Sequence, residues 1–381
     1  MSSERKSTYR LIAALVFGLV VLAGLLAACG NSDAGKTTST KNVAATTVAT
    51  GQTVTMTDQA GRKVTIPKTI NKVYGMSPVA VDDVYMLAAD KLVGWNYAPA
   101  ASEKKYVLPQ YQNLPSLGGW YGKNNTGNIE EIIKAKPDIV LSVGEITSTT
   151  IAQADKVQNQ LNIPVVLVND KLTTTGDTLR YLGKLLGVET RAEQLATYCD
   201  QVVSEAQTNT AKLKDSDKVK IYYAEGNKGL NTDPSGSQHT EVFDLVGAVN
   251  VAQVKNASAY GMAAVSMEQV ISWNPDAIFV ASDPSQQTHV WSDIMSGSTW
   301  KSLKAVTSKA VYQIPHGPFD WTDRPPCASR ILGIRWVGTL LYPDLYKYDM
   351  KAETKKFYKL FYQMDLTDAQ LAELTVNAGL K

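Results

Sequence analysis

The chain has 381 residues, of which 44% are hydrophobic, with 38 basic and 36 acidic side chains and three cysteines. Its length exceeds the ~250–300 residues at which one hydrophobic core usually stops growing, so we expect more than one domain. A formal charge of +2 excludes the net attraction on which non-specific nucleic-acid binding depends, and the ordinary apolar content with few cysteines excludes a disordered chain or a disulfide-dense miniprotein.

The first thirty residues have the pattern of a bacterial export leader. Three basic residues lie within positions 5–10, residues 11–28 are almost all apolar, and Leu26-Ala27-Ala28 comes directly before Cys29. A basic start, an apolar run and a small-residue cleavage site are typical of a secretory signal, although the run is also long enough for an uncleaved membrane anchor. The end of the run resembles a lipobox. This implies cleavage after residue 28, lipidation of Cys29 and attachment to the outer face of the cytoplasmic membrane.

Residues 29–51 are rich in Ser, Thr, Ala, Lys and Asn and lack apolar periodicity, so we expect a flexible tether. Residues 1–28 carry three basic and one acidic side chain, which leaves the remaining chain formally neutral. Any attraction to a charged ligand must therefore be local. Cys199 and Cys327 remain, and the sequence leaves open whether they pair.

Short apolar segments alternate with helical patterns along the rest of the chain. We expect strands at residues 72–74, 139–141, 165–168, 220–223, 277–280 and 310–314. Strands of this kind, separated by helices, are typical of parallel sheets. A long helix is predicted over residues 190–212, with Thr190 and Glu193 as a capping box and Cys199 on its apolar stripe. It would span roughly 33 Å at 1.5 Å per residue, enough to join two domains.

Two segments repeat at an offset of 138 positions, so that matching residues are Glu130 and Glu268, Pro137 and Pro275, and Asp138 and Asp276. Each copy predicts an N-cap, a short amphipathic helix, a Pro-Asp stop and a buried strand. Helix–Pro–Asp–strand is also a common α/β connection, but both interpretations predict two α/β units of similar size.

We therefore predict an α/β fold of two lobes, each with a central, mostly parallel sheet flanked by helices, joined by one long connecting helix. The predicted boundaries are a signal peptide at residues 1–28, the lipidated Cys29 and tether at 29–51, an N-terminal lobe at 52–171, a connecting helical segment at 172–216 and a C-terminal lobe at 217–381.

This organisation resembles the substrate-binding lipoproteins of bacterial ABC importers, in the class with a rigid connecting helix. The similarity covers nearly the whole mature chain and includes residues 54–66 (VTMTDQAGRKVTI), 236–241 (GSQHTE) and 319–326 (FDWTDRPP). It implies an opening β-hairpin at residues 54–66 and a protein that is not an enzyme. The implied cargo is a metal chelate such as a ferric siderophore, with cobalamin, haem and molybdate or tungstate as alternatives. The implied partners are the ABC permease and its ATPase, and we expect a monomer without a cofactor.

The resemblance also gives the repeated glutamates a role. In this class one Glu on each lobe docks the permease, and the matching positions here are Glu130 and Glu268. The alternative is that each acid only complements the dipole at the start of a helix.

In two-lobe α/β binders the ligand lies beside the carboxyl ends of the strands. This rule selects loops whose candidate ligand contacts are Ser77, Trp120, Tyr121, Thr232, Ser237, His239, Tyr260, Phe319, Trp321 and Arg324. Ser77 is expected to begin a helix whose N–H groups face an anion, and aromatic rings beside arginine suit a flat anionic chelate. The alternatives are core packing for Phe319 and Trp321 and helix capping for Arg324, while Arg330 is expected inside the following helix.

The histidines lack metal-binding spacing, so we predict no dedicated metal site. An exported hydrolase and a lipoprotein sensor that presents its ligand to a receptor are the alternatives from other classes. The absence of Gly-x-Ser-x-Gly and His-Glu-x-x-His motifs disfavours the hydrolase. A neighbouring permease gene would favour transport, and a receptor kinase gene would favour the sensor.

Overall fold

The described chain opens with β1 (Thr53–Thr57) and β2 (Lys63–Pro67), which pair antiparallel as expected for a hairpin. Gly61 in its turn has a φ of 81°, in the left-handed region that favours glycine. The computed structural model describes residues 52–122, 125–255, 261–282 and 289–380, which belong to one compact unit, Gly51–Lys381. The predicted signal peptide, Cys29, the tether and Tyr260 lie outside the described residues.

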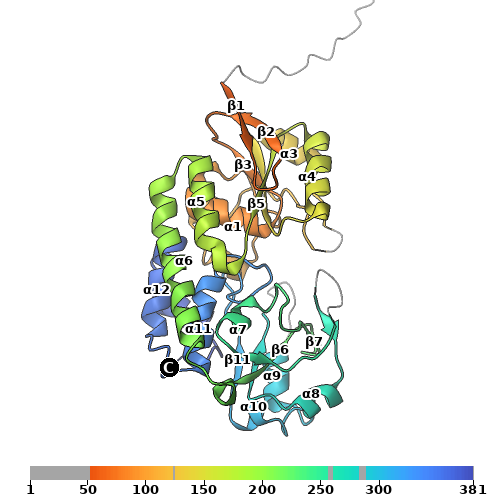
Figure 1. The fold of residues 1–381 in the computed structure, drawn as a ribbon, viewed down its shortest axis with the longest axis vertical. Helices are drawn as coiled ribbons and strands as arrows, with labels where there is room; N and C mark the ends of the chain where they lie inside the picture. The colour runs from red at the N-terminus through yellow and green to blue at the C-terminus, as the bar shows by residue number, and fades with distance from the viewer. Residues whose placement is uncertain (1–51, 123–124, 256–260, 283–288, 381) are drawn as a thin grey trace, which may run out of the picture. The chain divides into compact units, whose positions relative to one another are not determined.

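The N-terminal lobe is built on a parallel sheet in the order β3-β4-β5, formed by β3 (Val73–Gly75), β4 (Ile139–Gly144) and β5 (Val165–Asn169). The strand residues are almost all buried because helices cover the sheet (Figure 1). These helices are α1 (Pro78–Ala88), α3 (Ile129–Ala135) and α4 (Ser148–Leu161), with the short α2 (Ala101–Lys104) further along the chain.

The C-terminal lobe has a second parallel sheet in the order β11-β10-β6-β8. Its strands are β6 (Lys220–Ala224), β8 (Val249–Asn250), β10 (Ala277–Val280) and β11 (Val311–Gln313). A small antiparallel pair, β7 (Asn231–Thr232) and β9 (Ala263–Ala264), lies beside it. The helices of this lobe are α7 (Glu241–Leu245), α8 (Met267–Trp273), α9 (Val290–Ser296) and α10 (Lys304–Thr307).

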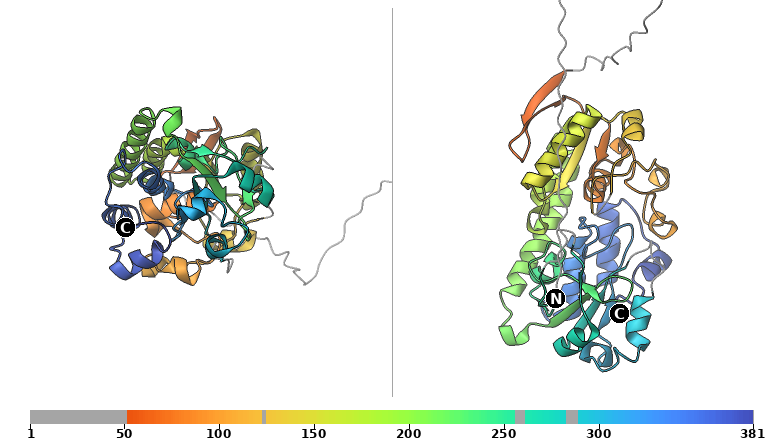
Figure 2. Two further views of the ribbon diagram at one scale, coloured as in Figure 1. Left: turned by 90° about the horizontal axis from the view of Figure 1, so that it is seen from below. Right: turned by 90° about the vertical axis from the view of Figure 1, so that its right-hand side faces the viewer.

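The predicted long helix is α6 (Glu189–Thr210), which follows α5 (Thr175–Leu186). It runs alongside both sheets in two views (Figures 1 and 2), and its predicted apolar stripe is buried. The predicted capping box is wrong: the helix begins at Glu189, before Thr190, with Val188 as an N-cap that has no side-chain hydrogen bond. Glu193 instead accepts hydrogen bonds from Arg180. Cys199 and Cys327 are both buried and unpaired.

Three helices complete the chain, α11 (Arg330–Leu341), α12 (Met350–Phe361) and α13 (Asp368–Leu374). They return toward the N-terminal lobe, where the ring of Tyr362 lies 6.1 Å from that of Tyr85. Short 3-10 turns are found at Ala89–Lys91, Pro109–Tyr111, Leu172–Thr174 and Asp215–Asp217. Across the described residues, no helix combines the length and apolar character needed to span a bilayer.

The internal repeat is structural as well as sequential. Asn128 and Ser266 are the N-caps of α3 and α8, and each accepts a hydrogen bond from a backbone N–H in the helix's first turn. Asp138 then accepts hydrogen bonds from the backbone of Asn71 and Lys72, and Asp276 accepts one from Lys220. Each Pro-Asp thus fixes the start of the neighbouring strand, β3 in one lobe and β6 in the other.

Candidate ligand-binding cleft

Loops from both lobes meet around a cavity of about 470 Å³, a size that suits a small molecule. The N-terminal lobe contributes residues that follow β4 and β5, and the C-terminal lobe contributes the loop at residues 236–238, part of α7 and the start of α11. We call this space the Arg330 cavity; it is lined by Val79, Gly144, Glu145, Asp170, Lys171, Leu172, Thr173, Gly236, Ser237, Gln238, Glu241, Asp244, Leu245, Pro326 and Arg330. Its position agrees with the expected site at the carboxyl ends of strands.

Arg330 connects the two lobes at this cavity. It is the first residue of α11, as expected, and its side chain is 4% exposed. Its guanidinium pairs with Glu241 of the same lobe and lies 3.5 Å from a carboxylate oxygen of Asp170 in the N-terminal lobe. Burial raises the pKa of Asp170, and the charge of Arg330 opposes that shift. The single guanidinium of Arg330 thus interacts with one carboxylate from each lobe.

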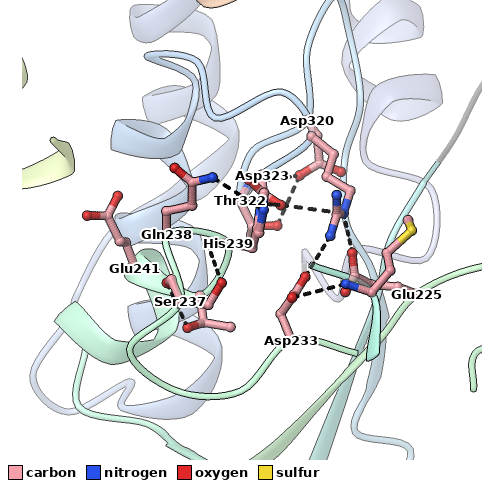
Figure 3. Close-up of polar contacts among 12 residues, drawn as sticks. Glu225, Asp233, Ser237, Gln238, His239, Glu241, Asp320, Thr322 and Asp323 are labelled. Carbon is pink, nitrogen blue, oxygen red and sulfur yellow. Dashed lines mark hydrogen bonds and ion pairs between the residues drawn. The ribbon is translucent and has the colours of Figure 1, made fainter. Parts of the chain in front are cut away.

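Arg324 lies in a second buried network, on the C-terminal lobe. Figure 3 labels three acidic members of this network, Glu225, Asp233 and Asp323. The Arg324 guanidinium pairs with Glu225, directly after β6, and its Nη2 lies 2.6 Å from Asp233, directly after β7. Burial disfavours the charge of this guanidinium, but Tyr223, Glu225 and Asp323 outweigh that effect and raise its pKa. A quarter of the Arg324 side chain (25%) remains exposed.

Most of the acids around Arg324 are deeply buried. Burial raises the pKa of Glu225 to about 9, although Arg324 opposes the shift. Burial also raises the pKa of Asp320 to about 6, with His316 acting in the opposite direction. Asp320 accepts hydrogen bonds from the backbone of Thr322 and Asp323, which fixes the loop that carries Arg324.

His239 belongs to the same network. Its Nδ1 lies 2.7 Å from a carboxylate oxygen of Asp323, and its backbone N–H donates to the hydroxyl of Ser237. Its Nε2 lies 3.5 Å from the side-chain amide nitrogen of Gln238. The arrangement presents fixed polar groups, which suits binding of a ligand.

Two predicted aromatic contacts lie in the core. The Trp321 side chain has 0% exposure, packs edge-on against Trp336 and donates its indole N–H to Tyr358. Phe319 is also buried, at 4% exposure. Both therefore fit the packing alternative that the sequence left open.

The N-terminal lobe supplies Ser77, Trp120 and Tyr121 from loops beside β3. Ser77 is the N-cap of α1, as expected, and its hydroxyl accepts from the N–H of Ala80 at 3.4 Å. Trp120 is half-buried, with its ring edge-on to Tyr74 and its backbone N–H donating to Met76. Tyr121 is half-buried too, and burial raises its pKa.

The remaining predicted positions differ in exposure. Thr232 is completely buried in β7, and its hydroxyl has no hydrogen-bond partner among the described residues. Glu130 and Glu268 are exposed in the first turns of α3 and α8. Within the described part of the chain, no group of three or more His, Cys, Asp or Glu side chains is placed to hold a metal ion.

The sequence did not identify the acidic side chains around Arg324 and Arg330 as part of the site. Glu225 directly follows a predicted strand, and Asp323 is adjacent to Arg324. The rule that ligands bind beside the carboxyl ends of strands, if applied to every polar residue that follows a predicted strand, would have selected Glu225. Nothing in the local pattern indicates Asp170, because its partner Arg330 is 160 positions away.

The comparisons with known proteins place this fold and cleft in a family. Residues 77–317 match the family described as periplasmic binding protein. The chain belongs to the periplasmic binding protein family. It is accordingly a binding protein and not an enzyme, and its α/β fold with two parallel sheets is the one predicted.

Individual relatives cover most of the chain. The molybdate-binding protein MolA of Haemophilus influenzae is 30% identical over 337 residues, which is 81% of this chain and 90% of that protein. The substrate-binding lipoprotein YvrC of Bacillus subtilis, named as part of an uncharacterized ABC transporter, is 25% identical over 88% of this chain and 97% of its own. The structure of an ABC transporter solute-binding protein from Sulfurospirillum deleyianum is 33% identical and covers 84% of this chain and 98% of its own, with a TM-score of 0.77.

Proposed function

We propose that this protein is the extracytoplasmic, lipid-anchored solute-binding component of an ABC importer. It takes up one solute between its two lobes and delivers it to the permease and ATPase. The observation that carries this proposal is a cavity of about 470 Å³, lined by both lobes, in a member of the periplasmic binding protein family. The lipoprotein and ABC-transporter names of relatives support the anchoring and the partners.

For the solute, we propose a metal–oxygen anion of the molybdate type. The expectation of a flat chelate depended on stacking by Phe319 and Trp321, and both rings are buried. Ser237 and Arg330 are polar residues that line the cavity, and the backbone of His239 is hydrogen-bonded to Ser237. Trp120 and Tyr121 are the half-buried aromatic candidates that remain. The molybdate-binding relative at 30% identity supports this choice. Ferric siderophores and cobalamin remain the alternatives, because other relatives bind iron(3+)-hydroxamate or vitamin B12 by name.

Titration of the purified protein tests the solute. Molybdate and tungstate should give a saturable change in intrinsic fluorescence, whereas a ferric hydroxamate, a ferric catecholate, cobalamin, haemin and sulfate should not. A response to one of the chelates alone would replace the oxyanion with that ligand. No response to any member of the panel would contradict solute binding of this class.

Arg324 is the residue whose role in binding is easiest to test. Charge-assisted hydrogen bonds contribute about 1.5–3 kcal/mol, so Arg324→Ala should weaken molybdate binding at least tenfold. Arg180→Ala is the matched control, because Arg180 also pairs with several carboxylates but lies on α5. Equal affinities for wild type and Arg324→Ala would remove Arg324 from the site.

Delivery is tested separately from binding. Glu130→Lys with Glu268→Lys should stop uptake while leaving solute affinity intact, because both side chains are exposed, outside the cleft. Glu131→Lys, one position along the same helix, is the control and should transport normally. A loss of solute affinity in the double variant would argue against a docking role.

Substitution of Cys29 tests the proposed lipid anchor. Cys29→Ser removes the proposed site of lipidation, so the labelled lipid that wild type incorporates should be absent from this variant. Lipid incorporation at the wild-type level would show that Cys29 is not the attachment site.

A further inference from the structure

The two repeated helices can be compared position by position. α3 reads IEEIIKA and α8 reads MEQVISW over seven positions each. Only two positions are identical, Glu130 with Glu268 and Ile133 with Ile271. The buried position between them has changed, from Ile132 in one copy to Val270 in the other.

Both identical positions are exposed. Ile133 is 46% exposed and Ile271 is 44% exposed, whereas Ile132 and Val270 are fully buried. In each helix the isoleucine lies three residues after the glutamate, a spacing that places both side chains on one face. Single exposed apolar residues are common and need no explanation. Here, however, two copies differ at their core position and agree only where the side chains face solvent, which the fold does not require.

We propose that Ile133 and Ile271 are apolar contacts to the permease, so that each lobe presents the same Glu–Ile pair to its partner. The inference rests on the proposed function and extends its docking surface beyond the glutamates. The partner it fits carries the same socket twice, each socket combining a basic group for the carboxylate with an apolar hollow for the isoleucine. The carboxylate sets orientation, and burial of the isoleucine supplies affinity.

Binding of the full-length protein to the detergent-solubilised permease–ATPase complex tests this pairing. Ile133→Ser and Ile271→Ser should each weaken binding about tenfold, because each variant loses the free energy gained by burying one isoleucine side chain against the permease. The double variant should lose about a hundredfold, because distant sites are usually additive. Val376→Ser is the control, as Val376 is 57% exposed beyond the end of α13 and should bind like wild type. The affinity for molybdate should be unchanged throughout.

Several outcomes would overturn the proposal. Wild-type affinity in the double variant would show that the isoleucines are not contacts, and the proposed function would stand if the Glu130→Lys, Glu268→Lys variant still failed to dock. A loss seen in proteoliposomes but not in detergent would assign the isoleucines to lipid instead. If the wild-type protein itself did not bind the complex, the proposed function would fail along with the inference.

Discussion

Asp82 and Asp83 lie at successive buried positions of α1. Burial raises the pKa of Asp82 to about 8, although the hydroxyl of Tyr362, 3.5 Å away, favours the ionised form. Burial also raises the pKa of Asp83 well above its usual range, helped by the charges of Asp170 and Asp82 and opposed by Arg330. At neutral pH, Asp82 is therefore a neutral acid in the core.

This burial predicts a pH dependence of stability. Between the unfolded value of 3.8 and about 8 the folded chain holds a proton on Asp82 that the unfolded chain lacks. The free energy of unfolding therefore falls as pH rises through that window, by about 1.4 kcal/mol per pH unit from this group. Asp82→Asn should flatten that slope and be more stable than wild type above pH 8, as measured by urea unfolding from pH 5 to 9. Asp90→Asn, at an exposed position, should keep the wild-type slope.

Among the elements, α5 and α6 pack closely together where Gly183 faces Ala192. A Cβ added at Gly183 would lie 2.2 Å from the Cβ of Ala192, well inside contact distance. Because both atoms belong to helices that pack along their length, neither can easily move.

Gly183→Ala should therefore destabilise the protein. Alanine is the better helix former by about 1 kcal/mol, but overpacking of this kind usually costs about 1–3 kcal/mol. We expect a lower urea midpoint with an unchanged m-value. Gln194→Ala, on the exposed face of α6, is the control and should be neutral or slightly stabilising. A Gly183→Ala variant as stable as wild type would mean that the two helices separate without cost.

Elements were more predictable than the directions of side chains. The repeat predicted α3 and α8 with their caps and strands, because capping and apolar periodicity are local in sequence. The capping box of α6 was wrong because the helix begins at Glu189, which places Thr190 inside its first turn, and Glu193 pairs with Arg180 on the preceding helix. The direction of Trp321 depends on Trp336 and Tyr358, which come later in the chain, so its loop alone indicates a ligand contact as readily as a core residue.

At the scale of the whole described unit, several polar contacts join the lobes, and two of them pair a buried acid with a buried basic side chain. Arg330 reaches Asp170 at 3.5 Å, and His316 lies 3.0 Å from Glu103. All four side chains are largely buried. Charged groups held this way are costly to leave without a partner.

Arg330→Met should therefore destabilise the protein by roughly 3–5 kcal/mol, because Asp170 and Asp83 would lose their nearby cation. Asp170→Asn in the same chain should recover part of that loss, and a double-mutant cycle of unfolding free energies measures the coupling. Arg180→Met, whose guanidinium pairs at the surface, should cost less than about 1 kcal/mol. Additive effects of Arg330→Met and Asp170→Asn would show that the contact does not couple the lobes.

The β1–β2 hairpin is the first element that a force applied at residue 52 would act on. Thr53 pairs with Pro67 at the open end of the hairpin, whereas its turn is bonded to β5 through Asp58, Gln59 and Arg62. A pull at residue 52 thus strains the Thr53–Pro67 pair first and opens the ladder one pair at a time, releasing about 3.3 Å of chain per residue. Only when the ladder has opened as far as the turn does the pull act on the hydrogen bonds between the turn and β5.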